Sequence, residues 1–187
     1  MKKGFLLAAV AAAVVAVQAE TKIGVVDMVI LVKNHPNYEP NKELLSSTDK
    51  DYKKKLEVIK AEGEKLQSEG KQLAEQLRSP MLADKAKGDV ERKLMDIQQK
   101  LVAAEQRYRG EAMRFRQDLQ DLEGRLLGTT TTDLRRRIAK FADEKDYDII
   151  IDKQAAPFAD DSLDVTDDIL EAMGVNPKDA KGRDEGK

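Results

Sequence analysis

Cysteine and tryptophan are absent from the 187-residue sequence, and histidine occurs once, at His35. Without cysteine, no disulfide can stabilise the fold, so stability depends on packing or on oligomerisation. A zinc site is excluded as well, because His35 has neither a cysteine nor a second histidine to join it. Aromatic residues make up 4% of the chain and charged residues 36%. These proportions exclude one large compact core and favour long helices with a narrow apolar seam beside a small core.

Motifs that support catalysis are also missing. The sequence has no Gly-x-Ser-x-Gly nucleophile elbow and no glycine-rich phosphate loop. We therefore expect no enzyme activity, no cofactor and no metal. The acidic run "DDSLDVTDDILEAMG" invites a calcium interpretation, but no register places both the glycine and the glutamate that an EF-hand loop needs. The run favours a short helix instead, with Asp164 as N-cap, Asp167 and Asp168 in the first turn and Gly174 at the end.

The N-terminus has the pattern of a secretory signal peptide. Lys2 and Lys3 precede the apolar run "FLLAAVAAAVVAV", and Val17-Gln18-Ala19 supplies small residues before a cleavage site. A membrane anchor is the alternative, but the thirteen apolar residues are too few to span a bilayer comfortably. We expect cleavage after Ala19 and export of the chain.

Heptad spacing predicts a coiled coil downstream. Bulky apolar residues recur every seven positions at Leu45, Tyr52, Ile59, Leu66 and Leu73, and the matching second positions are Leu56, Gly63, Gly70 and Leu77. A second seam contains Val90, Leu94, Ile97, Leu101, Ala104, Tyr108, Ala112, Phe115, Leu119, Leu122 and Leu126, and Leu134, Ile138 and Phe141 carry a helical stripe onward towards Lys145. Glycine inside a helix costs about 1 kcal/mol relative to alanine, so Gly63 and Gly70 either allow close backbone approach or loosen the helix.

The segment Ser79-Pro80-Met81-Leu82 separates the two seams. Proline disfavours helical geometry in the preceding residue and cannot donate the hydrogen bond that a continuing helix needs. The break therefore predicts an antiparallel helical hairpin. Its first limb, residues 49–78, has 30 residues and a length of about 45 Å. Pro80, Met81 and Leu82 form the tip, where Met81 and Leu82 are either ordinary turn residues or an apolar contact point.

Two short β-branched runs flank the hairpin, "TKIGVVDM" at residues 21–28 and "YDIIID" at residues 147–152. Their successive apolar residues are typical of strands buried on both faces. Two strands alone are marginally stable in water, so we expect a small sheet that is completed by other copies of the chain. The candidate residues of this oligomeric body are Ile23, Val25, Val26, Met28, Ile149, Ile150 and Ile151.

Charge is distributed unevenly along the chain. Residues 49–116 contain 17 basic and 13 acidic residues, whereas residues 143–187 contain 6 basic and 14 acidic ones. A basic arm favours anionic lipid headgroups or an acidic polypeptide as a partner, and no nucleic acid is expected. The densest patch, "RYRGEAMRFR", offers Arg107, Arg109, Arg114 and Arg116 as candidate anionic contacts. An ordinary solvated face is the alternative, because acidic residues are interleaved throughout.

The runs "KIGVVDM", "YDIIID" and "DVTDDIL", together with the charged hairpin between the first two, resemble the Skp/OmpH family of periplasmic chaperones over residues 22–174. The resemblance implies a periplasmic homotrimer in which helical arms extend from a β-rich body. It also implies that the arms hold unfolded outer-membrane β-barrel proteins without ATP, and that lipopolysaccharide is a further candidate partner. The chain departs from the basic character of well-studied members, because its pI is about 5.7.

From the pattern and the resemblance we predict an α+β fold, in which a long antiparallel coiled-coil hairpin stands on a small β-rich body completed by trimerisation. The expected parts are a signal peptide (1–19), a trimerisation body (20–48 and 123–174), an arm (49–122) and a disordered tail (175–187). The expected function is that of an ATP-independent holdase that encloses unfolded outer-membrane proteins. A structural coiled-coil spacer or scaffold in the cell envelope is the alternative.

Overall fold

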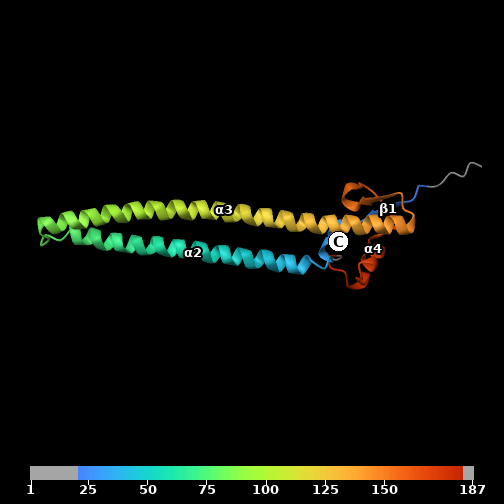
Figure 1. Cartoon of the computed structure of the whole chain (residues 1–187), viewed down its shortest axis with the longest axis horizontal. Helices are drawn as coiled ribbons and strands as arrows, with labels where there is room; N and C mark the ends of the chain where they lie inside the picture. The colour runs from blue at the N-terminus through green and yellow to red at the C-terminus, as the bar shows by residue number, and fades with distance from the viewer. Residues whose placement is uncertain (1–20, 183–187) are drawn as a thin grey trace, which may run out of the picture.

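A computed structural model describes residues 21–182, so the predicted signal peptide and the last five residues lie outside the described part. The chain order is β1 (Ile23–Val26), α1 (Met28–Lys33), α2 (Tyr38–Leu77), α3 (Asp84–Lys145), β2 (Ile149–Asp152) and α4 (Thr166–Ala172), with short 3-10 turns at Lys153–Ala155, Asp161–Leu163 and Pro177–Asp179. Helices α2 and α3 form a long antiparallel hairpin, and the other elements gather at one end of it (Figure 1). The predicted α+β fold of the single chain is confirmed.

The two limbs of the hairpin are longer than the heptads indicated. Helix α2 has 40 residues and α3 has 62, which correspond to about 60 Å and 93 Å of helix. The first limb was expected to begin near residue 49, but α2 already begins at Tyr38. Pro40 does not prevent this, because the first turn of a helix has no intrahelical partner for its N–H groups. Helix α3 runs from the tip along the whole length of α2, and then continues beyond the start of α2 into the body.

The tip of the hairpin is a tight turn around Pro80. The N–H of Leu82 donates to the carbonyl oxygen of Ser79 over 3.3 Å, which puts Pro80 at the second position of a four-residue turn. Met81 is 92% exposed, whereas Leu82 is partly buried. The two apolar tip residues therefore differ, and only Met81 presents its side chain fully to solvent.

The predicted seams pack against each other along the hairpin, with one exception. Every seam position from Leu45 to Leu126 is at least partly buried except Tyr108, which is 39% exposed. Tyr108 lies between two successive four-residue steps of the pattern, from Ala104 to Tyr108 and from Tyr108 to Ala112. Near the middle of the arm, the rings of Tyr52 and Phe115 stack with their centroids 4.1 Å apart.

Close backbone approach does not account for the glycines of α2. A Cβ atom at Gly63 would meet nothing within 4 Å, and one at Gly70 would lie 3.4 Å from Cγ2 of Ile97, an ordinary contact distance. Both positions therefore have room for alanine. Of the two interpretations that the sequence left open, a loosened helix agrees with this geometry.

The two strands form a parallel pair in the body. Ile23 pairs with Ile149 and Val26 with Asp152, and on the other side of β1 the backbone of Val165 donates to the carbonyl oxygen of Val25 over 2.8 Å. Parallel strands require a long crossover connection, and here the crossover is the entire helical hairpin. The expectation that both faces of the strands are buried holds for β1 after Ile23, where Gly24, Val25 and Val26 are buried, but not for β2, where Ile149 and Ile151 are 48% and 37% exposed in the single chain.

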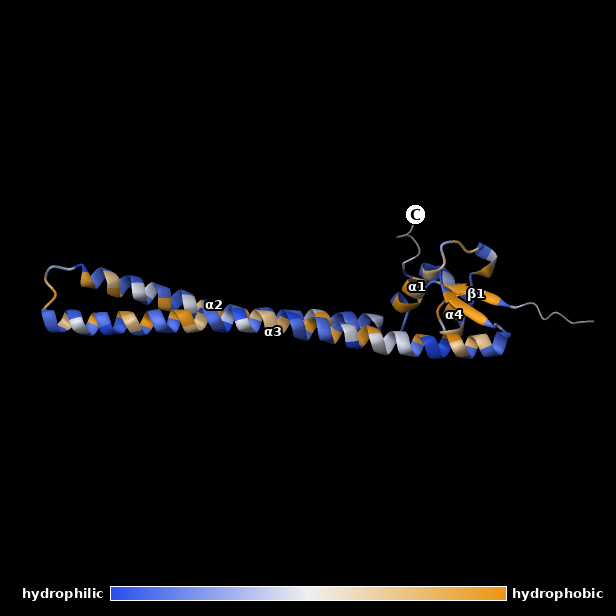
Figure 2. Cartoon of the chain, turned by 90° about the horizontal axis from the view of Figure 1, so that it is seen from above, coloured by the Kyte–Doolittle hydropathy of each residue, from blue (hydrophilic) through white to orange (hydrophobic). Residues whose placement is uncertain are grey.

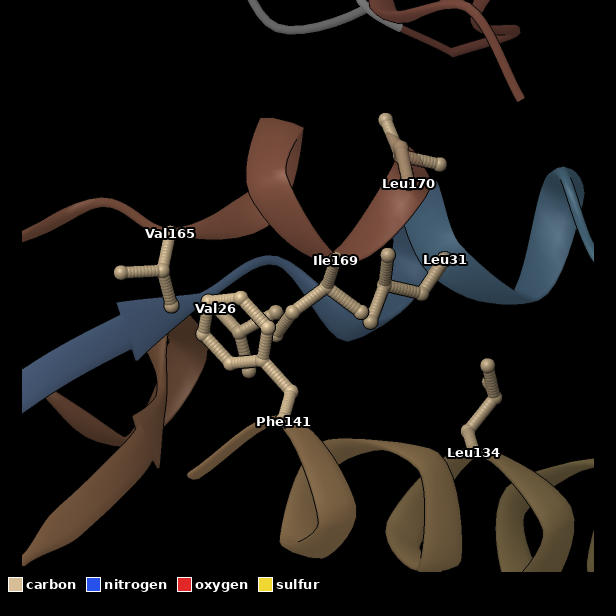
Figure 3. Packing of buried hydrophobic residues seen from close by; sticks show 7 residues of the cluster. All are labelled: Val26, Leu31, Leu134, Phe141, Val165, Ile169 and Leu170. Atoms are coloured by element: carbon tan, nitrogen blue, oxygen red, sulfur yellow. The ribbon is translucent and has the colours of Figure 1, made fainter. Parts of the chain in front are cut away.

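A small apolar core ties the hairpin to the strands (Figure 3). Its buried members are Val26, Leu31, Leu134, Phe141, Val165, Ile169 and Leu170. They come from β1, α1, the last turns of α3, and α4 with the residue before it. The core is thus built from segments at both ends of the described chain, and α3 supplies the surface on which the others pack.

A polar chain connects the beginnings of α1 and α4. The carboxylate of Asp27 caps α1 by accepting from the N–H groups of Val29 and Ile30, and the Asp27 N–H donates to the hydroxyl of Thr166 over 2.9 Å. Thr166 in turn donates to Asp164. Asp164 is therefore not the predicted N-cap: α4 begins at Thr166, and Asp164 holds the Thr166 hydroxyl and N–H from two residues before it.

The segment after α4 is folded as far as the structure describes it, which corrects the expected disordered tail. Gly174 ends the helix with a φ of +81°, as predicted. Val175 and Ala180 then pack against the core, and Lys181 donates its N–H to Asn34 and its ammonium group to Glu39. The apolar residues of this stretch are few, but they lie where the core still has an uncovered side.

We expect Leu134→Ala to lower the free energy of unfolding by about 3 kcal/mol, because it removes a fully buried side chain from the core that joins α3 to α1 and α4. Urea unfolding at one fixed protein concentration measures the loss. Met113→Ala on the same helix is the control, since Met113 is 75% exposed. Equal losses in the two variants would contradict the assignment of the core.

We expect the double variant Gly63→Ala/Gly70→Ala to stiffen α2, because alanine is favoured over glycine by about 1 kcal/mol at each helical position and both sites have room for it. Hydrogen exchange along the first limb should slow relative to the unmodified chain, while exchange in the body stays the same. Unchanged exchange around both sites would show that the glycines do not loosen the arm.

Candidate functional site

The exposed face of the sheet is the first candidate surface. Ile23, Ile149 and Ile151 are 38%, 48% and 37% exposed, respectively. The register puts Ile23 beside Ile149, and because side chains alternate along a strand, Ile149 and Ile151 point to the same side. The remaining candidates for the body differ in burial: Val25 and Val26 are buried, and Met28 and Ile150 are partly buried. The three exposed isoleucines thus form an apolar patch on the strand pair of the single chain. Figure 2 colours these strands as hydrophobic.

A groove lies on the other side of the strands, where α1, α3 and β2 meet, since it is lined by Ile150 and not by Ile149 or Ile151. It has a volume of about 700 Å³, and its apolar lining includes Val29, Val32, Leu127, Ile138 and Ile150. Sequence reasoning did not find it, because the lining comes from segments more than a hundred residues apart. No local signal marks such a groove.

Phe158 is a second apolar feature that the sequence reasoning passed over. It lies between the 3-10 turns Lys153–Ala155 and Asp161–Leu163, and its side chain is 85% exposed. Its position after Pro157 in a chain with few aromatic residues was the available signal. A large aromatic side chain this exposed adds to the uncovered apolar surface of the body.

The predicted anionic contacts on the arm are largely paired with carboxylates. Arg107 forms an ion pair with Glu62 across the hairpin, and Arg109 pairs with Glu105 one turn before it. Arg114 lies 3.8 Å from Asp118, measured from Nε to Oδ2. For Arg116, no ion pair is found among residues 21–182. These arginines do not converge on one site, and the geometry agrees better with a solvated, salt-bridged face than with a dedicated anion site.

His35 is buried at the junction between the body and the arm. It is 6% exposed, its Nε2 lies 3.1 Å from Oδ2 of Asp133, and its Nδ1 accepts the N–H of Asn37. Because Nδ1 accepts, Nε2 donates to Asp133. Asp133 also receives bonds from Arg136 and Arg137. The hydrogen bond from Arg137, followed by that from His35, holds the pKa of the Asp133 carboxyl well below its usual range. The arrangement fixes the start of α2 against α3.

Neither a metal cluster nor a membrane-spanning helix is found between residues 21 and 182. No three histidine, cysteine, aspartate or glutamate side chains in this range are grouped to hold a metal ion. None of the helices there combines the length and the apolar character that a membrane span requires.

A family model described as "Outer membrane protein (OmpH-like)" matches residues 22–173, which include every described α-helix and strand. A search of curated proteins finds no significant match.

We expect the stability of the fold to fall on acidification partly through Asp133. Since its pKa is lowered in the folded state, its carboxylate stabilises the fold fully above the unfolded pKa of about 3.9, and this contribution is lost as the pH falls below that value. Melting temperatures between pH 2 and 7 test this. Asp133→Asn should melt lower than the unmodified chain at pH 7, and the gap should narrow toward pH 2.

Asp89→Asn is the control for this measurement, because Asp89 pairs with Arg92 on the exposed surface of the arm. Its melting temperature should follow that of the unmodified chain at every pH. If the gap for Asp133→Asn stayed constant with pH, the proposed role of the carboxylate would be wrong.

Proposed function

The chain belongs to the OmpH-like family of periplasmic chaperones, and on that basis we propose that it is an ATP-independent holdase that encloses unfolded outer-membrane β-barrel proteins between its arms. The observation that carries the proposal is the hairpin itself. Two helices of 40 and 62 residues leave a small body and extend far from it (Figure 1), and they offer a long surface rather than a deep pocket.

Such a surface suits the chemistry of the client. A strand of an outer-membrane barrel alternates apolar and polar residues, and before the barrel closes its backbone N–H and C=O groups are unpaired. Exposed edges of this kind aggregate by pairing with one another. Enclosure between long arms separates the edges, and many weak contacts hold the client without a specific sequence.

We propose further that the body assembles as a homotrimer. Among the described residues, β2 pairs with β1 alone, and two strands of 4 residues each are marginal in water. The exposed side chains of Ile23, Ile149 and Ile151 give a second copy an apolar surface to cover. In this arrangement residues 20–48 and 123–174 form the body and residues 49–122 the arm.

The proposed location is the periplasm, with removal of the signal peptide after Ala19. Anionic lipid or lipopolysaccharide remains a proposed further partner through Arg107, Arg109, Arg114 and Arg116. Three of these arginines are already paired with carboxylates on the exposed surface of the arm. We therefore expect their contact with an anionic lipid to depend strongly on ionic strength.

The second candidate is a coiled-coil spacer in the cell envelope, and the tip favours it. Met81 is 92% exposed at the far end of the hairpin, where a folded partner has free access. A spacer binds one folded partner through this tip, whereas a holdase accepts different unfolded barrels along the arm. Deletion of residues 79–82 separates the two functions, because only the spacer depends on them.

Size-exclusion chromatography with light scattering on residues 20–187 tests the holdase proposal. The chain is measured alone, and then after rapid dilution of a urea-unfolded outer-membrane barrel protein into it. We expect the mass of three chains alone, and an increase by one client mass while the client stays soluble.

Three other outcomes are informative. An oligomer that leaves the client to aggregate would refute the holdase function and favour the spacer. A monomer would refute the proposed assembly through the strands. An increase in mass that requires ATP would refute the passive mechanism.

A further inference from the structure

Helix α3 carries a second uncharged face besides its seam. Along residues 88–131, 16 of the 44 residues are charged. Starting at Gly88 and moving along the helix by seven, seven and four residues, and then repeating these steps, one nevertheless meets only uncharged residues. Because seven, seven and four residues together make five whole turns, these positions share one face of the helix. These positions are Gly88, Met95, Val102, Gln106, Met113, Gln120, Gly124 and Thr131. At about 100° per residue they all lie within roughly 20° of Met95 around the helix.

The apolar members of this face point to solvent. Met95, Val102 and Met113 are 56%, 55% and 75% exposed. The seam residues Ile97 and Phe115 are buried on the opposite side of the helix, about 200° from Met95. Helix α2 covers only that side, so nothing in the described chain covers the second face. Leu127 is 52% exposed and lies about 40° from Met95 around the helix. We call Met95, Val102, Met113 and Leu127 together the α3 track.

The track leads directly into the groove of the body. Leu127 and Thr131 line the arm side of the groove, and Ile138 and Ala142 continue the same face of α3 along it. From Met95 to Ala142 the helix covers about 70 Å. One surface with few charges thus runs from the outer half of the arm to the groove between α1, α3 and β2, with Arg109 beside it and Arg135 at its inner end, each about 40° from Met95 around the helix.

The chemistry of the track favours one kind of occupant. A second helix would need bulky residues every three or four positions, but the apolar residues here are seven to fourteen apart, with glutamine and glycine between them. Methionine adapts to different apolar partners. The amides of Gln106 and Gln120 both donate and accept, which suits the unpaired backbone groups of an extended chain. The absence of charge on the face matches the uncharged, lipid-facing side of a membrane β-strand.

We propose that the α3 track is the surface on which the client lies, as an unfolded polypeptide in extended conformation with its apolar side chains against Met95, Val102 and Met113. This inference rests on the holdase function proposed above and deepens it by assigning the contact to one face of one helix. The seam and the tip are not part of this surface.

Lysine substitution on the track tests the proposal. Met95→Lys/Met113→Lys puts two charges on it, while lysine and methionine have similar helix propensities. Leu44→Lys/Val58→Lys is the matched control, because these residues are 46% and 68% exposed on α2 and lie off the track. Affinity for a urea-unfolded outer-membrane barrel protein, labelled with a fluorophore, is measured for all three proteins together with helix content and oligomer mass.

We expect the Kd of the track variant to rise at least about tenfold, and that of the control to change less than about twofold, because only the track variant loses apolar contacts with the client. Equal affinities in all three proteins would overturn the inference and leave the holdase function intact. No binding by the unmodified chain would refute the holdase function itself. A changed oligomer mass in the track variant alone would show that the track contacts a second copy, which also overturns the inference.

Site-specific crosslinking gives an independent test that requires no loss of binding. The chain has no cysteine, so Met113→Cys and Val58→Cys each introduce a single thiol that accepts a benzophenone label. With the unfolded barrel protein present, illumination should join the client to the label at position 113 several times more often than to the label at position 58. Equal yields at the two positions would mean that client contacts are spread over the whole arm.

Discussion

The parallel pairing of β1 with β2 is the constraint on which the rest of the structure depends. Parallel neighbours need a long crossover, and the chain makes this connection with a helical hairpin that includes α2 and α3. Since two four-residue strands cannot form a stable sheet alone, α3 must extend beyond its partner helix to supply Leu134 and Phe141 to the core. The length difference between the limbs, 40 residues against 62, follows from this requirement.

The same helix therefore has different tasks along its length. In the arm its seam holds α2, and in the body its last turns hold β1, α1 and α4. At the junction, the buried His35 and the carboxylate of Asp133 fix where α2 leaves α3. The direction of the arm relative to the body is set by α3, which runs as one helix through both, and the network holds the start of α2 against it.

Three groups of apolar side chains are left uncovered among residues 21–182: those on the exposed side of the strands, those in the groove, and those on the outer face of α3. Other exposed apolar residues, such as Met81 at the tip and Leu44 and Val58 on α2, occur singly. A chain with few aromatic residues and a third of its residues charged has little apolar surface to spare. The grouping of this surface is what connects the architecture to binding. Assembly through the sheet and contact with unfolded chains along α3 use separate parts of this surface.

The sequence by itself determined the hairpin, its turn at Pro80 and the seam residues, because heptad spacing and proline act locally along the chain. It also indicated the strands, but not that Ile23, Ile149 and Ile151 remain exposed, since coverage of a strand depends on distant segments. The folded segment after Gly174 and the position of Asp164 outside α4 were decided by tertiary contacts with the core and with Thr166. The early start of α2 puts Glu39 within reach of Lys181, which is distant in the sequence. The groove was beyond sequence reasoning for the same reason: its walls meet only when β1 and β2 pair.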